Sequence, residues 1–194
     1  MDNMLVEIDT RTLKVTQQFA LNKTADTTST MKHSSGHGME PPKPGDNSCS
    51  PTWAEPAGDS VYVACNNSSE IVEVNTRDWQ IVRRIAGRAG VYNLEATHDG
   101  QRLIATNKRD QSVSIYELKS GRELARLPTK RKVLHGVVVS PDDRYAFVSV
   151  EGIGSEPGTV EVIDLAALKT VATIDVPPTA AGIDFYKTEP PMKP

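Results

Sequence analysis

Apolar and polar residues alternate in short runs along most of the chain, and turn residues separate the runs. Three segments of twelve residues align without gaps, and each reads as a turn followed by an alternating strand: Glu55–Asn66, Thr97–Lys108 and Ser140–Glu151. A period of two with many Val and Ile residues is typical of half-buried β-strands, whereas a helical period is absent. Successive copies begin about 42 residues apart, so the chain is predicted to be a tandem repeat of strands.

Every copy of the repeat contains four predicted strands. A short strand precedes each turn, at Ser50–Ala54, Tyr92–Ala96 and His135–Val139. Two more strands follow the aligned segment in each copy: Glu70–Asn75 and Trp79–Ile85, Ser112–Tyr116 and Glu123–Leu127, and Thr159–Asp164 and Lys169–Ile174. Four antiparallel strands in about 42 residues is the spacing of a β-propeller blade.

The repeat divides the whole chain into units. The predicted fold class is all-β, a partial β-propeller of about 3.5–4 four-stranded antiparallel blades. The expected units are a half blade at 1–21, an inserted His/Met/Pro-rich loop at 22–48, blades at 49–87, 88–129 and 130–178, an inner strand within 179–187 at Ala181–Tyr186, and a Pro-rich tail at 188–194. Because closed rings contain roughly 4–8 blades, we expect the C-terminal part of a propeller of about seven blades, closed by further N-terminal blades or by a second copy.

Parts of the third copy resemble a known repeat family. The segments Ser140–Ser149, Thr159–Asp164 and Val171–Ile174 resemble the YVTN-type repeats of bacterial β-propellers, whose relatives include the haem propeller of cytochrome-type nitrite reductases. The resemblance implies a propeller fold and a periplasmic or secreted location. The first nine residues show no basic region followed by an apolar one, the mark of a signal peptide. We expect any signal peptide to lie upstream, with the missing blades.

Strand alternation places the irregular loops of a blade on one rim of the propeller. Function often resides in variable loops on a rigid scaffold, so the site is expected there. Cations from adjacent blades converge on this rim, with a histidine at the mouth of the central channel: Arg88, Lys108, Arg109, Lys130, Arg131, Lys132 and His135. An anionic ligand or an acidic partner would suit this sector. The alternative is a solvated rim with scattered charges, because the chain as a whole has a net charge of −3.

The insertion carries a candidate metal site. Two methionines and two histidines form a near-palindrome at its centre: Met31, His33, His37 and Met39. Imidazole and thioether groups are ligands that Cu(I) accepts, so copper is the cofactor these residues favour. The alternative is a polar, Pro-bounded loop in which the four residues coincide by chance.

The two cysteines, Cys49 and Cys65, flank the hairpin whose turn is Pro56–Asp59. Opposed residues of an antiparallel hairpin have a constant index sum, which makes the two sulfurs near-neighbours to within one residue of register. One interpretation is a disulfide, which would fit an oxidising compartment. The other is a pair of free buried thiols.

Several function classes receive no support from the sequence. It contains no P-loop, dinucleotide fingerprint, nucleophile elbow, HExxH or paired CxxC. It also lacks an apolar run long enough for a membrane helix, and the basic charge or abundant aromatics expected for nucleic acid. We therefore expect a non-catalytic propeller module that binds a ligand or a protein. The alternative is a copper- or haem-associated electron-transfer propeller, and a propeller hydrolase ranks third, with only Glu95 and Asp184 as inner-strand acids.

Overall fold

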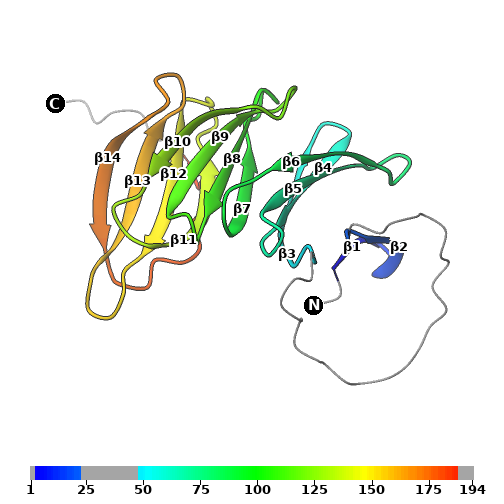
Figure 1. Cartoon of the computed structure of the whole chain (residues 1–194), viewed down its shortest axis with the longest axis horizontal. Helices are drawn as coiled ribbons and strands as arrows, with labels where there is room; N and C mark the ends of the chain where they lie inside the picture. The colour runs from blue at the N-terminus through cyan, green and yellow to red at the C-terminus, as the bar shows by residue number, and fades with distance from the viewer. Residues whose placement is uncertain (1–2, 23–47, 188–194) are drawn as a thin grey trace.

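The computed structural model describes residues 3–22 and 48–187, which form fourteen β-strands and no helix (Figure 1). The first two strands, β1 (Met4–Asp9) and β2 (Lys14–Ala20), pair antiparallel and form the half sheet. The other twelve form three four-stranded antiparallel sheets, each with its strands in chain order. The described part of the chain therefore offers no helical segment that is long and apolar enough to cross a bilayer.

The three sheets repeat one layout. The first sheet consists of β3 (Pro51–Ala57), β4 (Ser60–Cys65), β5 (Glu70–Asn75) and β6 (Ile81–Ala86). The second consists of β7 (Val91–Ala96), β8 (Arg102–Asn107), β9 (Ser112–Glu117) and β10 (Glu123–Pro128). The third consists of β11 (Val133–Val139), β12 (Tyr145–Glu151), β13 (Gly158–Asp164) and β14 (Lys169–Val176). Strands β3, β7 and β11 contact one another in succession and are the inner strands.

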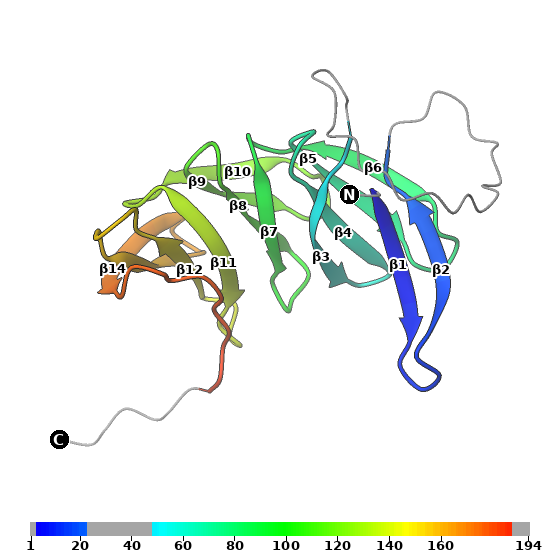
Figure 2. The same ribbon diagram turned by 90° about the horizontal axis from the view of Figure 1, so that it is seen from below.

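The sheets stack face to face along an arc (Figure 2). Ile71 and Val72 are adjacent on β5 and point into different cores, because successive side chains of a strand face opposite sides of its sheet. The largest buried side chains mark three cores, between the half and first, the first and second, and the second and third sheets: Leu21 with Val72, Ile71 with Leu94, and Ile104 with Leu134. Apolar burial between neighbouring sheets thus holds the arc together.

The all-β, four-strand repeat predicted from the sequence is confirmed, with three complete blades and one half blade in the described residues. The predicted alignment of the inner strands needs a correction. Thr52, rather than Ser50, occupies the place equivalent to Tyr92, because Pro51 pairs with Cys65 as Val91 pairs with Asn107. The reason is that the turn after β3 is shorter than the turn after β7. A comparison of the sequence without gaps does not allow for this difference in length.

The segment 179–187, called the terminal segment below, also differs from its prediction. The sequence predicts an inner strand at Ala181–Tyr186, whereas the segment lies beside β11 and joins no sheet (Figure 2). The carbonyl oxygen of Ala181 accepts hydrogen bonds from Ser149 Oγ at 2.5 Å and from the Gly136 N–H at 3.4 Å. A Cβ on Gly136 would lie 2.9 Å from the side chain of Ile183, so glycine permits this close approach.

Candidate functional site

Each inner strand carries a β-bulge near its first residues. The register shifts between Pro51 and Trp53 in β3, between Val91 and Asn93 in β7, and between Leu134 and Val137 in β11. A bulge leaves residues without a partner in the ladder and turns their side chains away from the regular alternation. Because the bulge recurs in all three sheets, the inner strands together present a row of side chains that lie outside the regular alternation.

Hydroxyl groups bridge the bulges of successive sheets. Thr106 Oγ1 accepts a hydrogen bond from the Asn93 N–H at 3.1 Å and donates one to the His135 carbonyl at 3.1 Å. Ser149 repeats this arrangement one sheet later, between the Gly136 N–H and the Ala181 carbonyl. The inner strands do not pair with one another as a ladder, so side-chain hydrogen bonds such as these help to fix their spacing.

The bulges open onto a cavity of about 500 Å³ along the inner strands. Its wall combines aromatic, acidic and backbone groups from all three inner strands and the terminal segment: Trp53, Tyr92, Asn93, Glu95, His135, Gly136, Val137, Val138, Ala181, Gly182, Ile183 and Asp184. The cavity thus brings together His135, Glu95 and Asp184, which the sequence indicates separately. We call it the inner-strand cavity.

The bulge residues Tyr92 and His135 form one mouth of the cavity. Their rings meet edge to face with centroids 6.0 Å apart, and Lys108 Nζ lies 3.9 Å from the Tyr92 ring centroid. His135 Nε2 lies 2.7 Å from Glu151 Oε2. These contacts hold the side chains of Lys108, Tyr92, His135 and Glu151 in a fixed arrangement.

Two acidic side chains, Glu95 and Asp184, line the same cavity, and Glu55 lies near Glu95 outside it. Burial and the charge of Glu55 raise the pKa of Glu95 to about 7, although the Val139 N–H donates to its carboxyl. Burial also raises the pKa of Glu55, whose Oε1 accepts the Ala96 N–H at 3.2 Å. Each of these carboxyls accepts a backbone N–H of the next inner strand. Both residues therefore stabilise the fold by connecting two strands and also place an acidic group near the cavity.

Asn93 stands between Tyr92 and Glu95 on β7, lines the cavity and is 5% exposed. Its side-chain oxygen has no hydrogen-bond partner, although buried polar groups are normally paired. The pattern of the sequence does not mark Asn93 or Trp53 as site residues. Their signal is the position of Asn93 two residues before Glu95 on one strand, which places both side chains on the same face.

Most of the cations predicted for the rim have acidic or backbone partners. Arg88 pairs with Glu123 and holds the pKa of that carboxyl below its usual range. Lys130 Nζ lies 3.1 Å from Asp175, and Arg131 Nη1 lies 2.6 Å from Glu156. The positive charge of this sector is therefore largely balanced.

The remaining rim cations have separate roles. Arg109 Nη2 donates to the backbone oxygen of Asn66 at 2.8 Å and so ties the second sheet to a loop of the first. Lys108 covers Tyr92, as described above, and Lys132 is exposed. The rim residues thus hold loops and neighbouring sheets together more than they form one anionic-ligand site.

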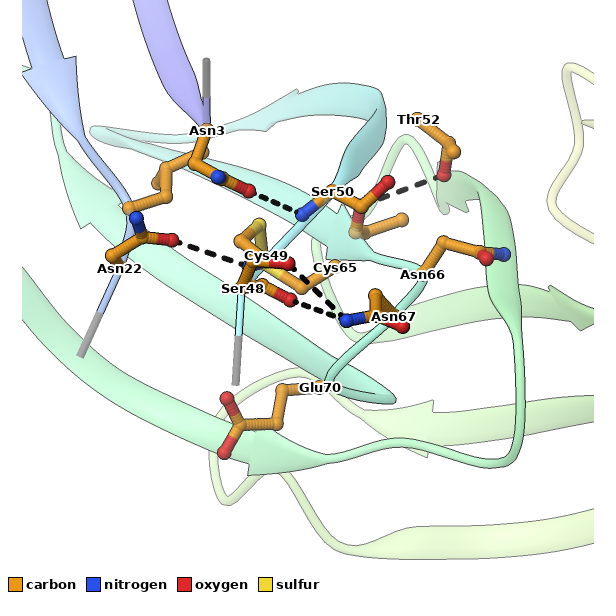
Figure 3. Close-up of a disulfide and its surroundings, with 12 residues drawn as sticks. Asn3, Asn22, Ser48, Cys49, Ser50, Thr52, Cys65, Asn66, Asn67 and Glu70 are labelled. Carbon is orange, nitrogen blue, oxygen red and sulfur yellow. Dashed lines mark hydrogen bonds between the residues drawn. A yellow bond between two sulfur atoms is a disulfide. The ribbon is translucent and has the colours of Figure 1, made fainter. Parts of the chain in front are cut away.

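The root of the insertion is firmly held, as Figure 3 shows. Cys49 forms a disulfide with Cys65 at the end of β4, and its N–H donates to Asn22 Oδ1 at 3.3 Å. Asn3 Oδ1 accepts the Ser50 N–H at 2.6 Å. The candidate metal ligands lie outside the described residues: Met31, His33, His37 and Met39. Within the described ranges, no group of three or more His, Cys, Asp or Glu side chains is arranged to hold a metal ion.

Stacked four-stranded sheets around inner strands define a β-propeller fold. No protein-family model and no curated protein matches the sequence. Among solved structures the chain is similar to Kuenenia stuttgartiensis hydrazine synthase, with a TM-score of 0.62 and 20% identity over 69% of this chain and 37% of that one. It is also similar to U3-55K (TM-score 0.56, 15% identity, 64% and 38% covered) and to the RRP9 WD40 repeats (TM-score 0.57, 17% identity, 64% and 38% covered).

The chain spans 37–38% of the length of these solved structures. At such low identity the similarity establishes the propeller fold and nothing about ligands or chemistry. The function must therefore be argued from the inner-strand cavity and the loops beside it.

Proposed function

We propose that this chain is a non-catalytic β-propeller module that binds a partner protein at the inner-strand cavity and the adjoining loop rim. The observation that carries the proposal is the cavity itself, in which the bulge residues Tyr92 and His135 share one surface with Trp53, which follows the bulge of β3. Bulges are common where a sheet must present side chains for function.

Exposed apolar side chains favour a protein as the ligand. Trp53 is 45% exposed on β3, and Ile153, in the loop after β12, is 57% exposed. Tryptophan is enriched among the residues that dominate binding energy at protein interfaces, and large apolar side chains in water gain most from being covered. The WD40 proteins among the structural neighbours are propellers too, and they supply the analogy for this use of the fold.

The proposed setting is the bacterial periplasm or cell exterior, in a protein of the YVTN-repeat kind. Its support is the sequence resemblance together with the Cys49–Cys65 disulfide. Disulfides persist in oxidising compartments and are rare in the cytosol. Mass spectrometry of the protein alkylated with and without reductant, after isolation from its native cells, tests this setting; two free thiols would contradict it.

Site-specific photo-crosslinking tests the proposed interface. A photoreactive phenylalanine analogue at Trp53 should crosslink a partner protein of discrete mass in cells. The matched control places the same analogue at Ser120, an exposed turn residue between β9 and β10 on the opposite rim. Crosslinks of equal yield from both positions, or none from Trp53, would remove the proposal.

A further inference from the structure

The inner-strand cavity presents an excess of hydrogen-bond acceptors. Asn93 Oδ1 is buried in its wall without a donor, and Glu95 and Asp184 line the same space. Two of the donors nearby are already engaged: His135 Nε2 contacts Glu151, and Lys108 Nζ lies on the Tyr92 ring. A ligand that satisfies this cavity must bring donors of its own.

We propose that the inner-strand cavity is a binding subsite for an organic cation, an ammonium or guanidinium group on an aliphatic stem. The inference rests on the proposed function, because a bound partner protein supplies such a group in every exposed lysine or arginine side chain. A free alkylamine has the same chemistry, and the experiment below separates the two sources.

The geometry favours an organic cation over a metal ion or an anion. A metal ion needs several ligands converging on one point, and no group of acidic and histidine side chains in the described residues does so. An anion would face Glu95, Asp184 and an unpaired carbonyl oxygen at once, which like charge and desolvation oppose. A guanidinium or ammonium group spreads its N–H donors and can reach separated acceptors.

The apolar part of the ligand also has a surface to occupy. The Trp53 ring is 45% exposed at the cavity. Lysine and arginine carry methylene stems that pack on apolar surfaces while the charged head makes polar contacts. Cations also bind to the faces of aromatic rings, as Lys108 does on Tyr92.

The charges around Glu95 predict how binding depends on pH. Glu55 on β3 and Asp184 on the terminal segment oppose ionisation of Glu95, and burial adds to this effect. His98 after β7 and the Val139 N–H on β11 favour it. The resulting pKa of about 7 means that a cation gains an ionised partner as the pH rises. Cation affinity should therefore increase between about pH 6 and about pH 8.

Calorimetric titration with defined cations tests the subsite. The probes, each at about pH 8, are agmatine and a capped pentapeptide with a central arginine. The control is the same peptide with citrulline in place of arginine, which removes the charge but keeps the shape. We expect the arginine peptide to bind about tenfold or more tightly than the citrulline peptide, since a charge-assisted hydrogen bond is lost. Glu95→Gln and Asn93→Ala should each weaken it to a similar degree.

Glu117→Gln is the matched control, because Glu117 lies at the end of β9, outside the cavity, where its carboxyl accepts a hydrogen bond from the Ser120 hydroxyl. Its affinity should equal that of the unaltered protein, and thermal unfolding shows that each variant is folded. Detectable binding of the arginine and citrulline peptides with equal affinity, or unchanged binding by Glu95→Gln, would overturn the subsite. Crosslinking from Trp53 without any cation binding would leave the proposed function and remove the subsite, whereas agmatine binding without peptide binding keeps the subsite and identifies a free amine as its ligand.

Discussion

The carboxyl of Glu95 shows how a single residue can serve both the fold and the site. It accepts the Val139 N–H of the neighbouring inner strand, and it lines the cavity. Burial and the Glu55 charge raise its pKa from 4.5 to about 7. An acid whose pKa is higher in the folded chain than in the unfolded chain destabilises the fold as the pH rises between those values.

Glu95→Gln should therefore stabilise the protein at high pH. Below about pH 4.5 the Glu95 carboxyl is protonated in both the folded and the unfolded wild type, so the variant has no advantage in stability. Above about pH 7 the carboxyl is ionised in both states, and the buried charge lowers the free energy of unfolding of the wild type by its full amount. We expect a gain of about 1 kcal/mol at pH 8, or about 2–4 °C in Tm, because partial solvent access reduces the effect. Thermal unfolding at both pH values checks this. A gain that is independent of pH would show that ionisation of Glu95 is not the cause.

The disulfide gives a second prediction for single residues. Cys49 and Cys65 are 16 residues apart, and closing a loop of this size stabilises a fold by about 3 kcal/mol through the unfolded chain. Replacing both with serine should lower the free energy of unfolding in urea by about that amount. Reductant should bring the wild type down to the level of the variant and leave the variant unchanged. An effect of reductant on the variant would contradict this explanation.

At the scale of elements, the strand pattern is readable from the sequence but the inner-strand bulges are not. The run of apolar and β-branched residues around Val61 and Val63 reveals β4 directly, and both faces of this strand are buried between neighbouring sheets. A bulge has no clear composition, and the turn after β3 is shorter than the turn after β7, so a gap-free comparison of the sequence could not align Thr52 with Tyr92. The acids Glu95 and Asp184 are visible in the sequence, whereas the orphaned oxygen of Asn93 depends on tertiary contacts.

The bridging hydroxyl of Ser149 predicts how the terminal segment is attached. Ser149→Ala removes the bond to the Ala181 carbonyl and leaves the Gly136 N–H without its side-chain acceptor, at a cost of about 1–3 kcal/mol. Amide hydrogen exchange should speed up in the terminal segment and at the β11 bulge. Ser120→Ala, in an exposed turn, is the control: it removes the acceptor of the Arg122 N–H but should leave exchange in the terminal segment and at the β11 bulge unchanged. Equal exchange in both variants would mean that other contacts hold the segment.

The whole molecule is a stack in which every sheet shares a core only with its neighbours. Ile104 and Leu134 belong to the core between the second and third sheets, and Ile71 belongs to the one before it. Side chains from one inter-sheet core do not reach the next, so stability is close to a sum of sheet and interface contributions. Loss of one interface should therefore act locally before it acts on the whole stack.

Leu134→Ala tests this additivity. The side chain is fully buried, and removing it should cost about 2–5 kcal/mol. Amide protection should fall first in the second and third sheets, while β4 and β5 keep theirs. Leu127→Ala, at the partly buried edge of the same core, is the matched control with a smaller loss. A uniform loss of protection across all three sheets would show that the stack unfolds as one unit.

The contacts that fix Asn22 and Cys49 have a consequence for the length of the connection between these two residues. Asn22 and Cys49 hold the two ends of the segment 23–47 together through a hydrogen bond, and the disulfide fixes Cys49 to β4. Loop-closure entropy depends only weakly on length once the ends are fixed. The described residues thus already hold positions 22 and 49 next to each other, so a longer connection between these two points would add only a small loop-closure entropy.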